Sequence, residues 1–185
     1  MSPDGDCDAT NDPQTGTLLV NAGKSRVAGI DYDGRIGLGN FAFTFGGNFL
    51  DTKTRELAVS AAIAPYLADR EIPFNLVAKT TFTAGMRYVL PIESVTTVTL
   101  SGDYYHSSPL SFGSARLPSY DIVNFRADFG NIYGKPIDLS LYMTNAFDER
   151  YQQLGAVTGA ALGFDSAIFG APRQYGLSLR YRFGG

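Results

Sequence analysis

From Thr17 onward, apolar and polar residues alternate with a period of two over long segments. In the segment 41–49, for example, Phe41, Phe43 and Phe45 fall on one side and Thr44 on the other. Successive side chains of a β-strand point to opposite faces, so this period predicts strands with one apolar and one wet face. The pattern recurs in the segments 81–90, 98–105, 123–129, 137–144 and 175–183.

A less regular segment, about 18–36, adds one more strand, with Ile30, Tyr32 and Ile36 on one side. The sequence therefore predicts an all-β fold: an antiparallel up-and-down meander of about seven long strands, each of roughly 11–16 residues. Residues 57–65 have the composition for one or two helical turns inside a long loop. No other segment predicts a helix.

The connections between the predicted strands are of two kinds, and the two kinds alternate along the chain. The short ones are Gly37–Gly39, Leu90–Ser94 and Asn131–Pro136, and the long ones are Leu57–Pro73, Ser107–Pro118 and Gln152–Pro172. In a meander this alternation places all short turns at one end and all long loops at the other. That layout is typical of an outer-membrane β-barrel.

Which face lies inside decides the class of protein. A soluble sheet turns its apolar face inward, whereas a membrane barrel turns it toward lipid. The strand length favours the membrane barrel, as does the clustering of aromatic residues at strand ends, which resembles interfacial girdles. These aromatic residues are Tyr88, Tyr104, Tyr105, Tyr120, Tyr133, Tyr151, Tyr181 and Phe183. A soluble β-sandwich with a solvated charged face remains the alternative.

The wet face carries many charges, too many for a dry interior and well suited to a water-filled lumen. The residues that we expect to face the lumen are Asp31, Asp33, Arg35, Arg87, Asp103, Arg126, Asp128, Arg180 and Arg182. The carboxylates of Asp31 and Asp33 are candidates for holding a second domain in the lumen or lining a substrate path, and otherwise only solvate the wall together with Arg35.

Several classes of function are disfavoured by composition. The net charge is −3 and the isoelectric point about 5.0, which argues against nucleic-acid binding. Cys7 is the single cysteine and His106 the single histidine, so we expect no disulfide within the chain, no metal site and no cofactor. Ser107 adjoins His106, but strand neighbours point to opposite sides. We therefore expect no catalytic residue and no enzyme, and leave the roles of Cys7 and His106 open.

Four ordered motifs resemble the C-terminal part of the barrel in TonB-dependent outer-membrane receptors. The stretch SLYMTNAFDERY (140–151) resembles the family's penultimate strand end, and FGAPRQYGLSLRYRF (169–183) its last strand. VNAGKSRVAGIDYD (20–33) and LPSYDIVNFRADFG (117–130) resemble two earlier strands of that barrel. The resemblance covers nearly the whole chain, and we divide it into a polar loop segment, 1–16, and a receptor portion, 17–185.

The resemblance implies an importer of the Gram-negative outer membrane that takes up a ferric siderophore or another bulky nutrient. It implies a plug domain and a segment that contacts the TonB complex, and we expect both to lie outside this C-terminal piece. Other implied partners are outer-membrane lipid, the missing N-terminal barrel and the barrel-assembly machinery. The long loops would face outside and help to capture the ligand, whose identity is not readable here.

The resemblance also assigns roles to two groups of residues. Gly176, Leu179, Tyr181 and Phe183 fit the C-terminal signal that the barrel-assembly machinery recognises. Asn145, Asp148, Arg150 and Arg173 stand where one strand ends and the next begins, so we expect a polar latch at the outer rim, with ordinary polar loop edges as the alternative.

An open sheet of seven strands has two free edges. A strand crossing hydrocarbon exposes on the order of ten backbone groups along a free edge, at several kcal/mol for each unsatisfied group. We therefore expect the edges to be completed by more chain, by closure, by oligomerisation or by aggregation. A self-contained small barrel is the second alternative, but Thr17–Val20 is too short for an eighth spanning strand.

Overall fold

The computed structural model describes residues 24–56, 74–112, 115–155 and 166–183. The chain divides into two contact units, of which the larger, Arg26–Lys53 with Ile72–Gly185, contains most of the described residues. The smaller unit, 1–25 with 54–71, falls almost entirely outside them. The predicted polar segment 1–16, Cys7, Thr17–Val20 and the predicted helical turns at 57–65 all lie outside the described residues.

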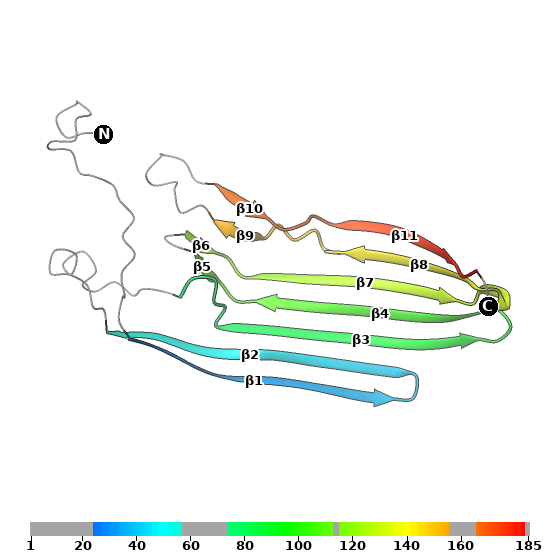
Figure 1. Cartoon of the computed structure of the whole chain (residues 1–185), viewed down its shortest axis with the longest axis horizontal. Helices are drawn as coiled ribbons and strands as arrows, with labels where there is room; N and C mark the ends of the chain where they lie inside the picture. Colours follow the sequence, from blue (N-terminus) through cyan, green and yellow to red (C-terminus); the bar gives the residue numbers. More distant parts are fainter. Residues whose placement is uncertain (1–23, 57–73, 113–114, 156–165, 184–185) are drawn as a thin grey trace, which may run out of the picture. The chain divides into compact units, whose positions relative to one another are not determined.

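Seven long strands form one sheet in the described part of the chain (Figure 1). Each long strand pairs with the long strand that precedes it and the one that follows it in the sequence, as in a meander. The sheet order is β1-β2-β3-β4-β7-β8-β11. The strands are β1 (Lys24–Leu38), β2 (Phe41–Glu56), β3 (Thr80–Ile92), β4 (Thr96–Ser107), β7 (Tyr120–Gly130), β8 (Ile137–Thr144) and β11 (Gln174–Tyr181). This confirms the predicted all-β antiparallel meander.

The predicted strand lengths hold for the first five strands but are wrong for the last two. β1 to β7 have 11 to 16 residues, whereas β8 and β11 have 8 residues each. The cause lies at Asn145, which follows β8 in the left-handed region at φ 48° and turns the chain away from the sheet. After β11, alternation continues in the sequence to Phe183, two residues beyond the end of the strand.

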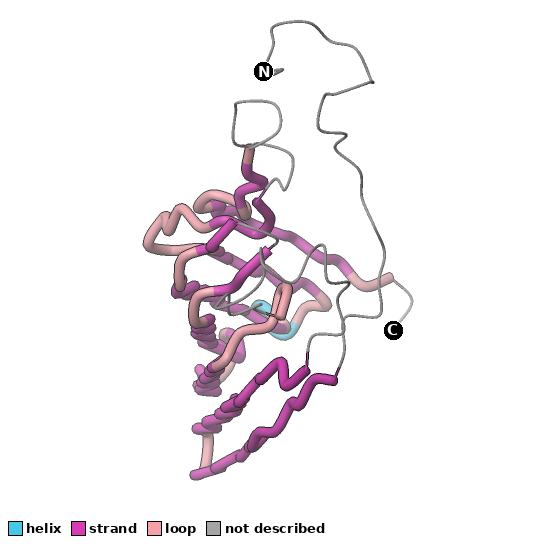
Figure 2. Tube along the Cα trace, turned by 90° about the vertical axis from the view of Figure 1, so that its left-hand side faces the viewer, coloured by secondary structure: helices cyan, strands magenta, loops and turns pink. Residues whose placement is uncertain are grey.

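The short connections are tight turns that use left-handed backbone conformations. Gly39 (φ 58°) turns β1 into β2, and Ser94 (φ 63°) lies between β3 and β4. The third turn contains a short 3-10 helix, Ile132–Gly134, which is preceded by Asn131 at φ 52° (Figure 2). No helix in the described segments is long and apolar enough to cross a membrane.

Two of the predicted long loops contain short hairpins. β5 (Leu110–Phe112) pairs with β6 (Ala115–Leu117), and β9 (Gln152–Gly155) pairs with β10 (Ala167–Phe169). In Figure 1 both hairpins lie at the end of the sheet opposite to the three short turns. We call this the long-loop end of the sheet.

The sheet has no sealed apolar core. Among the described residues only Val98 and Leu117 are buried apolar residues, at 7% and 0% exposure. A soluble sandwich would bury one whole face of the sheet against a second layer. In the described part of the chain, no second sheet covers the apolar face.

Candidate functional site

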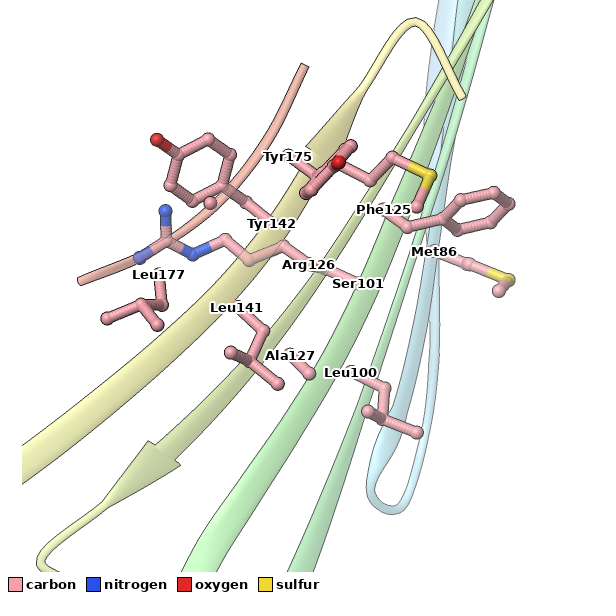
Figure 3. Close-up of a pocket in the computed structure, with 12 residues that line it drawn as sticks. Met86, Leu100, Ser101, Phe125, Arg126, Ala127, Leu141, Tyr142, Tyr175 and Leu177 are labelled. Carbon is pink, nitrogen blue, oxygen red and sulfur yellow. The ribbon is translucent and has the colours of Figure 1, made fainter. Parts of the chain in front are cut away.

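The strand register places the apolar residues in continuous rows on one face of the sheet, which we call the apolar face. One row crosses six strands and consists of Phe41, Tyr88, Leu100, Ala127, Leu141 and Leu177. The next row consists of Phe43, Met86, Gly102, Phe125, Met143 and Tyr175. Figure 3 shows Leu100, Ala127 and Leu141 next to one another on neighbouring strands.

Most of the large apolar side chains in these rows are exposed. Met86 is 50% and Phe125 44% exposed, on strands that have neighbours on both sides. They line a shallow, almost wholly apolar groove of about 820 Å³ that also includes Leu100, Leu141 and Leu177 (Figure 3). An exposed apolar surface of this extent marks a site of contact with a membrane or with another protein.

The height of the apolar face follows from the length of a strand. On β3 the face runs from Phe82 to Ile92, and the ten steps between these residues span about 33 Å at the usual rise per residue. At the tilt of about 45° that is usual for transmembrane strands, this length covers about 23 Å. The apolar band of outer-membrane barrels is about 25 Å tall. The two heights agree.

The opposite face, which we call the polar face, carries a network centred on Arg126. Its Nε donates to both carboxylate oxygens of Asp128 at 2.9 Å, and Nη2 donates to Ser140 Oγ at 3.0 Å. The Ser140 hydroxyl in turn donates to Asp128 Oδ1 at 2.6 Å. β7 and β8 are therefore joined across the polar face by a closed set of hydrogen bonds.

A second group joins β11 to the turn after β7. Arg182 donates from Nη1 to Asp138 Oδ2 at 2.6 Å and from Nη2 to Asn131 Oδ1 at 2.5 Å. Further along the same face, Asn124 donates to Asp103 Oδ2 at 2.6 Å. Asn124, Asn131, Asp138 and Ser140 were not among the predicted site residues, although alternation places Asn124, Asp138 and Ser140 on this face.

The structure brings the nine predicted lumen residues onto the polar face. Arg87, Asp103, Arg126, Asp128 and Arg180 lie there by register, and Arg182, just after β11, bonds to Asp138 on the same face. On β1, Asp33 lies beside Gly46 of the polar face, and by alternation Asp31 and Arg35 share that side. Within the described residues Asp31, Asp33, Arg35 and Arg180 form no salt bridge.

Asn145 is the best-connected of the four residues predicted at the rim. It is buried at 4% exposure, and its Nδ2 donates to the carbonyls of Glu149 at 2.9 Å and Ala171 at 3.0 Å. Its Oδ1 accepts the Glu149 N–H at 2.8 Å, and its own N–H donates to Asn124 Oδ1 at 2.9 Å. This single side chain connects the segment after β8 with the segment before β11.

The other three predicted rim residues act in different ways. Asp148 Oδ1 accepts the backbone N–H of Arg173 at 3.0 Å, so Arg173 contributes its main chain to this bond. Arg150 lies outside this group, with its guanidinium carbon 5.7 Å from the ring centre of Phe169. The Arg150–Phe169 contact was not predicted, because it depends on the fold of the β9–β10 hairpin.

The four residues predicted as the assembly signal all lie on β11 or just after it, at an edge of the sheet. Leu179 and Tyr181 lie on the apolar face, whereas Gly176 lies opposite Tyr142 on the polar face. Phe183 is exposed, and its ring centre lies 4.5 Å from that of Tyr181.

The aromatic residues at strand ends do not all lie on the apolar face, and Tyr105 and Tyr120 are two that do not. Both lie on the polar face, where their ring centres are 5.8 Å apart. Tyr120 also stacks on Tyr151, with 4.6 Å between ring centres. Tyr104 and Tyr88 do lie on the apolar face.

His106 lies on the apolar face at the long-loop end of β4. Its Nδ1 is 2.8 Å from Asp121 Oδ1, and the Tyr104 hydroxyl donates to the same oxygen at 2.5 Å. Ser107 lies on the polar face and donates to the Ser108 carbonyl at 3.1 Å, so it does not meet His106. In the part of the chain that the structure describes, no three metal-ligating side chains gather.

Comparison with known proteins gives a consistent result. The sequence model of the family described as "TonB dependent receptor-like, beta-barrel" matches residues 2–146. No curated protein matches the chain. The family is one of receptors and not of enzymes.

Three similar solved structures are siderophore receptors. They are the ferric yersiniabactin uptake receptor FyuA of Yersinia pestis (TM-score 0.72, 18% identity), the ferric preacinetobactin receptor BauA of Acinetobacter baumannii (0.64, 19%) and the siderophore receptor PiuA of the same species (0.63, 19%). The matches cover 89%, 86% and 84% of this chain but only 24%, 22% and 21% of those chains. At this identity the similarity shows the fold, and the chain spans less than a quarter of each receptor.

Proposed function

Because the chain belongs to the TonB-dependent receptor β-barrel family, we propose that it forms part of the wall of a nutrient receptor in the outer membrane of a Gram-negative bacterium. In this proposal the apolar face contacts lipid and the polar face lines the lumen. Residues 17–185 supply the C-terminal portion of the barrel. The chain supplies no catalytic residue and no cofactor site, because import of this kind makes and breaks no bond.

The observation that carries the proposal is the two-faced sheet itself. Large apolar side chains remain exposed along a band about 23 Å high, as derived above, while charged networks occupy the other face. In water, each Å² of apolar surface left exposed on this face would lose about 25 cal/mol of the stabilisation that burial provides. In a bilayer the same face needs no protein partner, since the acyl chains cover it.

The transported solute is a ferric siderophore or another bulky nutrient in this proposal, and TonB supplies the energy through a plug region outside the described residues. Support comes from the family match and from the similarity to the ferric yersiniabactin, ferric preacinetobactin and siderophore receptors. The β5–β6 and β9–β10 hairpins then face the outside and frame the entry to the lumen.

We assign two further roles within this proposal. Asn145 and Asp148 latch the strand-end segment after β8 to the segment before β11, as their hydrogen bonds to Ala171 and Arg173 suggest. The exposed apolar side chains of β11, Leu179 and Tyr181 among them, offer an edge strand to the barrel-assembly machinery. Addition of a strand to a free sheet edge is an established mode of peptide recognition.

An uptake experiment tests the function. Cells that lack their own siderophore receptors express the complete gene, and growth is measured in iron-poor medium with a panel of ferric hydroxamates, catecholates and phenolates. The proposal expects growth with at least one of them, and loss of that growth when TonB is deleted. If the protein is found in the outer membrane but no iron chelate supports TonB-dependent growth, the solute class is wrong. If the protein is found outside the membrane, the whole assignment is wrong.

A further inference from the structure

The β5–β6 and β9–β10 hairpins contact each other, although they belong to different connections of the sheet (Figure 1). β6 contacts β9, and Gly155 of β9 is buried against Ala115 of β6. A Cβ built at Gly155 would lie only 2.8 Å from the Ala115 Cβ. Leu117, the last residue of β6, is fully buried at 0% exposure. The two hairpins are therefore packed closely together at the long-loop end.

Tyr151 attaches the β9–β10 hairpin to the polar face of the sheet. Its ring stacks on that of Tyr120, at the start of β7, with 4.6 Å between ring centres and 24° between ring planes. The Tyr120 ring also contacts Tyr105 of β4, with 5.8 Å between ring centres. On the hairpin, the Tyr151 ring lies against the backbone of Gly170, where a Cβ would be 1.9 Å from Tyr151 Cζ. Tyr151 therefore joins the base of this hairpin to two strands of the sheet.

The β5–β6 hairpin has a second attachment of its own. The Leu76 N–H donates to the Ser111 carbonyl at 2.8 Å, and Asn75 forms a parallel bridge with Ser111. The segment that leads into β3 is therefore bonded to β5. Together with the contact between β6 and β9, this bond connects described parts of all three long connections.

We propose that the two hairpins form a preassembled frame around the lumen entry and remain joined while the solute enters. Tyr120 and Tyr151 are the residues that position this frame. Separating the hairpins from the sheet would break the tyrosine stack, and separating them from each other would open the contact at Gly155. Stacked aromatic rings stabilise a structure beyond the surface that they bury. This inference rests on the proposed function, because only in a barrel wall does the long-loop end surround an entry.

A disulfide between the hairpins tests whether they stay joined. The double variant Ala115→Cys with Gly155→Cys is made in a Cys7→Ser background of the complete protein. The two Cβ atoms must move apart by about 1 Å to reach the separation of about 3.8 Å that is usual in a disulfide. The matched control is Gly155→Ala with Ala115 unchanged, which adds the Cβ at position 155 without the bond. Bond formation is measured by labelling of free thiols, and uptake by the ferric chelate that supports growth of the wild type.

We expect the disulfide to form in the folded protein, and uptake to be equal in the oxidised and reduced states. Loss of uptake in the oxidised state, with recovery on reduction while the control is unaffected, would show that the hairpins must separate. Folded protein that does not form the bond would contradict the contact between them. Either result would overturn the inference.

A distance measurement tests the positioning role of Tyr151 without any import. Nitroxide labels are placed at the exposed positions Arg116 on β6 and Gln153 on β9, and the distances between them are measured by pulsed electron paramagnetic resonance. We expect one narrow distribution that does not change when the ferric chelate is added. Tyr151→Ala should broaden it, whereas Tyr151→Phe keeps the ring and should leave it narrow. The control Tyr133→Ala removes a 71% exposed ring at the other end of the sheet and should change nothing.

The two kinds of failure can be told apart. A broad distribution in the wild type, or one that shifts on addition of the chelate, would overturn the inference even if import is intact. A distribution that Tyr151→Ala leaves narrow would overturn the role of Tyr151. If no iron chelate supports TonB-dependent growth, the proposed solute class fails, and the distances alone still decide whether the hairpins are joined.

Discussion

Placing an arginine on either face of β4 separates a lipid-facing surface from a water-facing one. Leu100 lies in the middle of the apolar rows, 46% exposed, and its sequence neighbour Thr99 lies on the polar face opposite Asp128. The variants Leu100→Arg and Thr99→Arg add the same side chain one residue apart. They differ in the face that receives the charge and in the side chain that is replaced.

The expected cost of Leu100→Arg has two parts. An arginine on the lipid face near the middle of the bilayer costs about 2–4 kcal/mol. Loss of the leucine side chain's contact with lipid adds about 1 kcal/mol, taking the 46% exposed fraction of a side chain worth about 2 kcal/mol when fully buried. Together these terms lower the free energy of unfolding by about 3–5 kcal/mol. Thr99→Arg should change it by less than about 1 kcal/mol, since the polar face is wet.

The assay is urea unfolding of the complete protein in lipid vesicles, followed by the shift in electrophoretic mobility between folded and heated samples. If the apolar face instead met water, arginine at position 100 would behave as an ordinary surface substitution and change stability by about 0.5 kcal/mol or less. Equal costs for the two variants, or a larger cost for Thr99→Arg, would refute the assignment of the faces.

Three further predictions address single contacts. Asn145→Ala removes the hydrogen bonds to Glu149 and Ala171 from a buried site and should lower the free energy of unfolding by about 2–4 kcal/mol. The control Thr144→Ala, at an exposed position, should change it little. Loss of the latch should also speed proteolysis near residue 171, and an unchanged rate of cleavage there would contradict the latch. Gly47→Ala should impair folding, because a Cβ there would lie 2.3 Å from the Thr81 carbonyl oxygen. The control Gly37→Ala places a Cβ with nothing within 4 Å. Equal yields of folded protein for the two variants would count against the β2–β3 register. Arg182→Ala should cost less than about 1 kcal/mol in urea unfolding, because its salt bridge with Asp138 is half exposed, and a loss of several kcal/mol would show that the pair is sealed from water.

The architecture was predictable because one simple pattern determines it. Alternation identifies the strands and their faces without knowledge of tertiary contacts, and the lengths of the connections identify the meander. The same parity separates Tyr104 from Tyr105, since adjacent residues on a strand face opposite sides. Position near a strand end groups the two tyrosines but carries no information about the face on which each one lies.

Other features depend on contacts that no local pattern contains. The ends of β8 and β11 depend on the left-handed turn at Asn145 and on its hydrogen bond to Ala171, 26 residues away. The contact of Arg150 with Phe169 requires the β9–β10 hairpin, which the sequence indicated only as a long loop. The sequence predicted which residues lie on the polar face, but it did not predict that Arg126 bonds to both Asp128 and Ser140.

The central claim is that the two faces of the sheet meet different solvents, and a spin-label scan along β3 tests it most directly. Single cysteines from Phe82 to Leu90, in a Cys7→Ser background of the complete protein in lipid vesicles, carry a nitroxide whose collisions with oxygen and with a water-soluble nickel complex are measured. Oxygen collisions should peak at the even positions, such as 84, 86 and 88, and nickel collisions at the odd ones. Oxygen collisions that peak at the odd positions, or equal access of nickel to every position, would contradict the account.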